Sequence, residues 1–171
     1  MNTLNLRNSL LKARNNNEPL FLIEKVKEED FQGYIDCLYA IDSRNLSYPW
    51  TRKHWEGLNL ENYYLWLVKR EEAVIGFCLF QFLNGDSTCH LLKIAISYEF
   101  RNIGAGKAVL IESLKALSLV GAKNCYLEVH EKNHAAIKLY EYFGFKICRK
   151  VRNFYKDGGN ALCFLWSFSK I

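Results

Sequence analysis

The sequence contains a carboxylate, an amide and a phenol at positions where the chain can bring them together. Residues 124–130 have the composition of a β-strand, whose alternate side chains, Glu128 among them, point to one face. Asn133, Ala136 and Tyr140 follow at a spacing of nearly two helical turns, so they share one helix face. A carboxylate at a strand end and a phenol on the next helix can therefore meet in one cleft. Each residue also has an ordinary alternative, as a solvated glutamate, an N-cap asparagine and a core tyrosine.

A second candidate is the segment Arg101-Asn102-Ile103-Gly104-Ala105-Gly106-Lys107, which lies between a predicted strand and a long predicted helix. Small residues let a ligand approach the backbone, and the unpaired amides of a helix start favour phosphate. The spacing is neither G-x-x-x-x-G-K-[ST] nor G-x-G-x-x-G, which argues against triphosphate hydrolysis and against a dinucleotide fold. An ordinary glycine-containing turn is the alternative.

The elements that must position these residues alternate between strand and helix periodicity, which predicts an α/β protein. In chain order we expect a strand at 21–26, helices at 28–42 and 51–60, an antiparallel meander of strands at 63–69, 74–83 and 89–96, a helix of about four turns ending at Gly121, a strand at 124–130, a helix at 133–143 closed by Gly144, and a hairpin of strands at 145–155 and 161–168.

Length and composition narrow the class of protein. The chain has 171 residues, of which 50% are hydrophobic, so we expect one domain over residues 19–171 preceded by a polar, frayed extension at 1–18. No apolar run approaches the ~18 residues of a membrane span, and no secretory signal is evident, so we expect a cytoplasmic protein. The net charge of +5 suits an anionic ligand, but it is also common on ordinary surfaces.

Six scattered cysteines and four dispersed histidines show neither a C-x-x-C pair nor zinc-ligand spacing. We therefore expect reduced core cysteines and no metal.

Taken together, three motifs resemble the GNAT acyltransferase superfamily, and within it the ribosomal-protein alanine N-acetyltransferases. They are Ile94-Ala95-Ile96, the R-x-x-G-x-G that follows it, and L-E-V-x-x-x-N-x-x-A-x-x-L-Y-x-x-x-G-F at Leu127 to Phe145. The likeness is tight from Leu91 to Tyr155, looser at Tyr48 to Thr51, and does not include the first twenty residues. It implies an acyl-CoA N-acyltransferase fold, with a mixed, mostly antiparallel central sheet flanked by helices.

The resemblance also implies a role for each matching residue. Acetyl-CoA is the implied co-substrate, with no metal. Glu128 matches the family's general base and Tyr140 its general acid. The implied cofactor contacts are the backbone of Ile94, Ala95 and Ile96 with the pantetheine arm, the amides of Asn102, Ile103, Gly104, Ala105, Gly106 and Lys107 with the pyrophosphate, and the side chain of Asn133.

The implied reaction is direct attack, in a ternary complex, by the N-terminal α-amine of a protein, such as a small-subunit ribosomal protein that begins with alanine. An α-amine has a pKa near ~7.8 and a lysine near ~10.4, so the neutral lysine costs roughly 3.5 kcal/mol more at pH 7. The α-amine is thus the easier acceptor. We expect a monomer or weak dimer without a membrane or specific nucleic-acid partner.

A small-molecule amine, such as a polyamine or a drug, is the alternative acceptor. His130 stands where the family usually has arginine, and Gly159-Asn160-Ala161 lacks an acidic pair often found in the last hairpin. A basic peptide would be expected to use such acids. The loop from Tyr48 to Trp50 is the best candidate for the acceptor side.

A basic RNA-binding or ribosome-binding module is a further alternative of a different class. Arg149, Lys150, Arg152 and Lys156 would form its patch, and Tyr155 would stack on a base. A hairpin with an ordinary charged face explains the same residues, and no nucleic-acid fold signature accompanies them.

Overall fold

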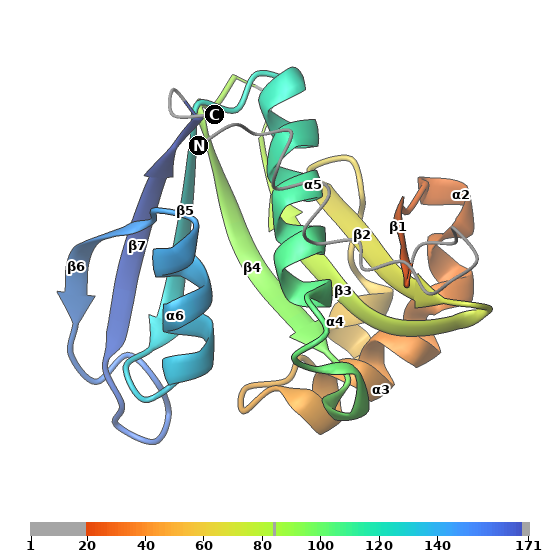
Figure 1. Cartoon of the computed structure of the whole chain (residues 1–171), viewed down its shortest axis with the longest axis horizontal. Helices are drawn as coiled ribbons and strands as arrows, with labels where there is room; N and C mark the ends of the chain where they lie inside the picture. Colours follow the sequence, from red (N-terminus) through yellow and green to blue (C-terminus); the bar gives the residue numbers. More distant parts are fainter. Residues whose placement is uncertain (1–19, 84, 169–171) are drawn as a thin grey trace.

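The computed structural model describes residues 20–83 and 85–168, and its centre is a seven-stranded sheet (Figure 1). The expected extension at 1–18 lies outside the described residues. The strands are β1 (Leu22–Lys25), β2 (Tyr63–Arg70), β3 (Ala73–Gln81), β4 (Thr88–Ile96), β5 (Asn124–His130), β6 (Lys146–Val151) and β7 (Ala161–Ser167), in the spatial order β1-β2-β3-β4-β5-β7-β6. Every neighbouring pair is antiparallel except β4 with β5, which confirms the predicted mixed, mostly antiparallel sheet.

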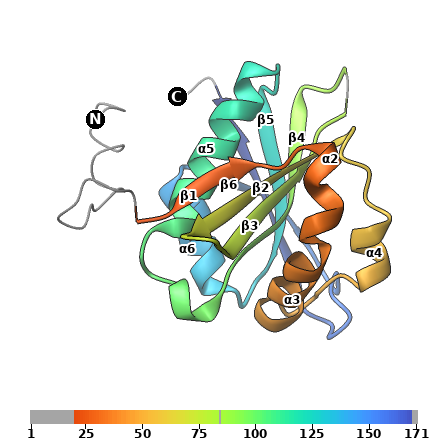
Figure 2. The ribbon, with the colours of Figure 1, turned by 90° about the vertical axis from the view of Figure 1, so that its right-hand side faces the viewer.

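Helices cover both faces of this sheet. They are α2 (Glu28–Phe31), α3 (Ile35–Asn45), α4 (Arg52–Glu56), α5 (Ala105–Leu119) and α6 (His134–Tyr142), with short 3-10 turns at Gln32–Tyr34 and Tyr98–Phe100. Figure 2 shows α5 on one side of the sheet and α3 on the other. None of the helices in the described part of the chain is long and apolar enough to cross a membrane.

The predicted order of elements is confirmed, and the differences are one interruption within a helix and shifts of element ends. The helix expected at 28–42 is interrupted by the 3-10 turn around Gly33, a residue with low helix propensity, and its second part continues to Asn45. The helix expected to reach residue 60 ends at Glu56. Its predicted cap is confirmed, because the Thr51 hydroxyl accepts a hydrogen bond from the His54 amide at 3.3 Å.

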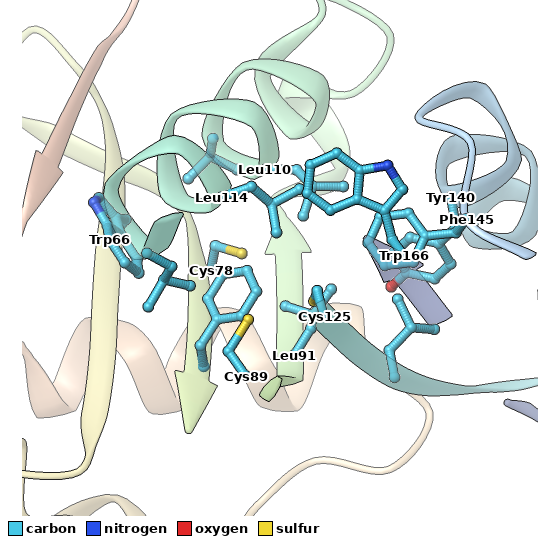
Figure 3. Close-up of a cluster of buried hydrophobic side chains, with 14 of the residues drawn as sticks. Trp66, Cys78, Cys89, Leu91, Leu110, Leu114, Cys125, Tyr140, Phe145 and Trp166 are labelled. Carbon is cyan, nitrogen blue, oxygen red and sulfur yellow. The ribbon is translucent and has the colours of Figure 1, made fainter. Parts of the chain in front are cut away.

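The side chains on the two faces of the sheet form two cores. One lies under α5 and α6, where Figure 3 shows Cys78, Cys89 and Cys125 among aromatic and aliphatic side chains. The other lies under α3 and α4 around Trp55 and Phe77. All six cysteines are free, but Cys148 is exposed because it lies on the edge strand β6, so the expectation of core cysteines is wrong there. No group of three or more metal-binding side chains occurs among residues 20–83 and 85–168.

The feature of the fold that makes a site is the separation of β4 from β5. The two strands pair only from Thr88 to His90 and from Asn124 to Tyr126. Beyond that point β4 stays paired with β3 and β5 stays paired with β7, so the two strands diverge (Figure 1). The β3–β4 register also shifts between Leu79 and Phe80, which leaves Leu92 as an extra residue in β4.

Gly76 lets β3 approach the part of β4 that borders this separation. A Cβ atom at this position would lie 2.6 Å from the carbonyl oxygen of Ala95 and would overlap the Ile96 side chain. We therefore expect Gly76→Ala to lower the free energy of unfolding by about 1–3 kcal/mol, measured by urea denaturation. Gly33→Ala is the control, since a Cβ there meets nothing within 4 Å. Equal midpoints for Gly76→Ala and the unmodified protein would contradict the proposed close approach.

Candidate active site

A cleft of about 550 Å³ occupies the space between the diverging ends of β4 and β5. Five parts of the chain line it. They are the end of α3 and the loop that follows (Asn45, Leu46, Ser47 and Tyr48), β4 with Arg101 (Leu91, Leu92, Lys93 and Ile94), β5 and its turn (Glu128, Val129, His130 and Lys132), α6 with its N-cap (Asn133, Ala136 and Tyr140), and the loop before β7 (Tyr155 and Asp157). The three side chains first singled out by spacing, Glu128, Asn133 and Tyr140, therefore meet in one cleft.

Glu128 is held in the cleft wall by a histidine that sequence reasoning did not find. His90 Nε2 lies 2.7 Å from Glu128 Oε2, and because an ionised carboxylate only accepts, the imidazole donates. The Glu128 side chain is 21% exposed. Burial alone would raise the pKa of Glu128, but the hydrogen bond and attraction of His90 and a hydrogen bond from Tyr126 hold that pKa below its usual value. Glu128 is thus a half-buried, ionised proton acceptor.

Tyr140 of α6 brings an uncommitted hydroxyl to the same cleft. Its ring is buried near Phe145 and Phe164, with centroid distances of 5.7 and 6.0 Å, and Figure 3 places it beside Phe145. The hydroxyl makes no hydrogen bond to any residue in the described part of the chain. Burial raises the pKa of Tyr140, so the phenol stays protonated at neutral pH. It is chemically a proton donor that faces the cleft.

Asn133 is the N-cap of α6, which was the alternative role expected from the sequence, and it also lines the cleft. Its Oδ1 accepts a hydrogen bond from the Ala136 amide at 3.2 Å and so caps α6. Because the oxygen is committed to the helix, the amide nitrogen is the part of Asn133 that remains for a ligand.

The glycine segment has the geometry of an anion cradle. Asn102 and Gly104 have positive φ values of 62° and 90°, and α5 begins directly afterwards without a side-chain cap. Among the described residues, the amides of Asn102 to Lys107 find no hydrogen-bond partner. The ammonium of Lys107 lies 3.5 Å from the ring centroid of Tyr142. Backbone amides and the helix dipole thus supply this segment's attraction for an anion.

The predicted cofactor residues of β4 divide between the cleft and the cores. Ile94 lines the cleft, whereas Ala95 packs into the core under α3 and Ile96 against the core under α5. The carbonyl oxygen of Ile96 already accepts a hydrogen bond from Arg101 Nε at 3.1 Å. The cleft therefore brings Ile94 together with Glu128, Asn133 and Tyr140, and residues 102–107 lie outside its lining.

Aromatic side chains and a carboxylate form the entrance on the other side. The ring of Tyr48 stacks on Tyr155 with centroids 4.5 Å apart, and His130 lies 4.9 Å from Tyr155. Tyr48 donates a hydrogen bond to Asp157, which also accepts one from the Gly159 amide at 2.9 Å. These bonds, that of Gly159 first, lower the pKa of Asp157. An acidic group is therefore present near the last hairpin although Gly159-Asn160-Ala161 has none.

Two of the four basic residues considered for RNA binding have partners within the protein. Lys150 pairs with Glu131 at 2.8 Å, and Arg149 is hydrogen-bonded to Tyr126. One face of Tyr155 is covered by Tyr48 inside the cleft. The stack with Tyr48 therefore occupies one face of the ring that was predicted to stack on a base.

Comparison with known proteins gives consistent relatives. The family model described as "Acetyltransferase (GNAT) family" matches residues 15–145 of this chain. The [ribosomal protein bS18]-alanine N-acetyltransferase of Escherichia coli K12 is 30% identical over 121 residues, 71% of this chain and 80% of that protein. An N-alpha-acetyltransferase of Sulfurisphaera tokodaii is 41% identical over 73 residues, 42% of this chain, and the match spans less than half, 44%, of that relative.

Solved structures agree in fold. The crystal structure of the ribosomal-protein-S18-alanine N-acetyltransferase from Escherichia coli superposes with a TM-score of 0.77 at 26% identity, covering 86% of this chain and 93% of that one. Arabidopsis thaliana NAA60 in complex with acetyl-CoA gives a TM-score of 0.74 over 87% of this chain and 99% of that one, and at 18% identity it supports the fold alone.

Proposed function

Because the chain belongs to the GNAT acetyltransferase family, we propose that it transfers the acetyl group of acetyl-CoA to the N-terminal α-amine of a protein. The observation that carries this proposal is the placement of an ionised Glu128 and a free Tyr140 hydroxyl on the walls of one cleft. The names of the bacterial and archaeal relatives support an α-amine as the acceptor.

Acetyl-CoA would lie along the edge of β4 that β5 leaves unpaired. The backbone of Ile94 to Ile96 would pair with the pantetheine arm, with the carbonyl of Ile96 shared with Arg101. The unpaired amides from Asn102 to Lys107 would hold the pyrophosphate, and the Asn133 side-chain amide would contact the cofactor nearby. The thioester would then reach the part of the cleft between Glu128 and Tyr140.

The chemistry follows from these positions. Glu128 takes a proton from the acceptor ammonium, and the neutral amine attacks the thioester carbonyl carbon. As the tetrahedral intermediate collapses, the carbon–sulfur bond breaks and Tyr140 donates its proton to the departing thiolate. The attacking nitrogen releases its second proton to solvent, Glu128 also returns its proton to solvent, and solvent restores the proton of Tyr140. The products are the acetylated N-terminus and free coenzyme A.

We propose a small-subunit ribosomal protein that begins with alanine as the acceptor. A protein N-terminus would enter beside the stacked rings of Tyr48 and Tyr155, where aromatic rings border the negative charge of Asp157. Asp157 supplies an acid of the kind that a basic peptide needs, although it stands outside the Gly159-Asn160-Ala161 segment. This placement favours the peptide over a small amine.

A competition between acceptors tests the proposal. Pure enzyme and acetyl-CoA are incubated with peptides that begin with alanine, the same peptides with blocked N-termini and an internal lysine, and a panel of polyamines and aminoglycoside drugs. Mass spectrometry is expected to find one acetyl group on the free α-amine and none on the blocked peptides. Acetylation confined to the polyamines or drugs would refute the N-terminal function while keeping the acetyltransferase chemistry.

A further inference from the structure

We propose that Lys93 is a positioning residue, which fixes the loop that carries Tyr48 against β4 and so sets the acceptor entrance of the cleft. The inference rests on the proposed function, because it assigns that loop to the acceptor side. Lys93 takes no part in the proton transfers described above.

Lys93 is a lysine in an unusual place, 7% exposed in the middle of β4. Its Nζ donates to Asp42 Oδ1 at 2.9 Å and to the carbonyl oxygen of Tyr48 at 3.2 Å. It also lies 5.0 Å from the ring centroid of Trp50. One buried ammonium therefore contacts both ends of the segment from Tyr48 to Trp50.

Asp42 bonds both to Lys93 and to the same loop. This aspartate at the end of α3 is fully buried. Its Oδ2 accepts hydrogen bonds from the Trp50 amide at 2.9 Å and from Trp55 Nε1 at 3.0 Å. The loop between α3 and α4 is thus hydrogen-bonded through its backbone at two positions, once to each member of a buried ion pair.

The fixed loop leads directly to the entrance. The ring of Tyr48, whose carbonyl Lys93 holds, stacks on Tyr155 and its hydroxyl bonds to Asp157. A shift of this backbone would move the Tyr48 ring and so change the shape of the entrance that an acceptor must pass. Lys93 precedes Ile94 in β4, so the strand proposed to hold the cofactor also sets the acceptor loop.

A contribution to stability alone is a weak explanation for the buried ion pair of Lys93 and Asp42. The cost of removing two charges from water offsets most of their attraction, and apolar replacements of buried pairs are often neutral. Removing one partner, by contrast, leaves an uncompensated buried charge. A test must therefore remove both charges together to separate position from folding.

The principal variant is Lys93→Met/Asp42→Asn, which removes both charges and keeps at residue 42 an oxygen that accepts hydrogen bonds. Lys93→Met alone shows the cost of the unpaired carboxylate. The matched control is Lys69→Met, because Lys69 also lies 2.9 Å from a carboxylate, that of Glu24, and 5.0 Å from an aromatic ring centroid, but on β2 away from the cleft.

Two measurements report on position. The chain has four tryptophans, so 19F NMR of 5-fluorotryptophan-labelled protein gives few signals, and Trp50→Phe assigns the one of interest. Kinetics give KM for the acceptor and Kd for acetyl-CoA. For the double variant we expect a moved or broadened Trp50 signal, an acceptor KM raised about tenfold or more, and a Kd for acetyl-CoA within about twofold of the original. Lys69→Met is expected to change none of these.

The double variant overturns the proposal if it folds with an unchanged Trp50 signal or an unchanged acceptor KM, or if Kd for acetyl-CoA rises in parallel. If only polyamines or drugs are acetylated, the N-terminal function is refuted. The role of Lys93 is then tested by comparing KM for the acetylated amine between the double variant and the unmodified protein. If no acceptor is acetylated at all, an unchanged Trp50 signal in the double variant still refutes the proposal that Lys93 fixes this loop, and a moved signal supports it.

Discussion

Replacing Tyr140 by phenylalanine is expected to lower kcat by about 10²- to 10⁴-fold at saturating acetyl-CoA, the usual contribution of a positioned proton donor. The ring would keep its packing against Phe145 and Phe164, so only the hydroxyl is lost. Without it the thiolate must leave as an anion in a buried cleft, where charge is poorly solvated. Kd for acetyl-CoA, measured by calorimetry, should stay within about twofold.

The matched control is Tyr142→Phe, which removes a hydroxyl from an exposed tyrosine two residues along the same helix. It should keep both kcat and the unfolding midpoint. The role of Tyr140 as the proton donor would be refuted by full turnover in Tyr140→Phe. A fall in kcat that disappears when the leaving thiol is made more acidic would support it, because a better leaving group needs no proton.

Much of the fold follows from local patterns that have one physical interpretation. The change from period two to period three or four after Ile96 predicts a strand and then a helix, and Gly121, with φ 103°, ends that helix as expected. The resemblance based on the motifs between Ile94 and Phe145 is confirmed by the family match. Glu128, Asn133 and Tyr140 share the cleft because strand and helix periodicity fix their directions.

The contacts that the sequence did not reveal are those between distant segments. His90 lies 38 residues before Glu128, and only the short parallel pairing of β4 with β5 brings them together. Asp157 reaches the entrance through the course of the loop between β6 and β7, which no periodicity describes. Lys93 looks like a surface lysine in a strand until the partner on α3 is known, since charged side chains are rarely buried.

Replacing Glu128 by glutamine is expected to lower kcat/KM by about 10²- to 10⁴-fold at pH 7, because the amide cannot take the proton of the acceptor ammonium. The deficit should narrow above about pH 8, where an α-amine with a pKa near ~7.8 is largely neutral without help. The measurement is kcat/KM for an alanine-initiated peptide between pH 5 and pH 9. A deficit that is constant with pH would mean that Glu128 does not remove the ammonium proton.

The environment of Glu128 predicts how the acidic side of the profile responds to its neighbours. Burial raises the pKa of this carboxyl, and the bonds of His90 and, more weakly, Tyr126 bring it below its usual value. A depressed carboxyl pKa keeps the base ionised to lower pH. Removing the donors should therefore move the acidic limb of kcat/KM to higher pH, further in His90→Leu than in Tyr126→Phe. If the acidic limb of kcat/KM stays at the same pH in both variants, another group causes that limb. Glu128 would then not be the base.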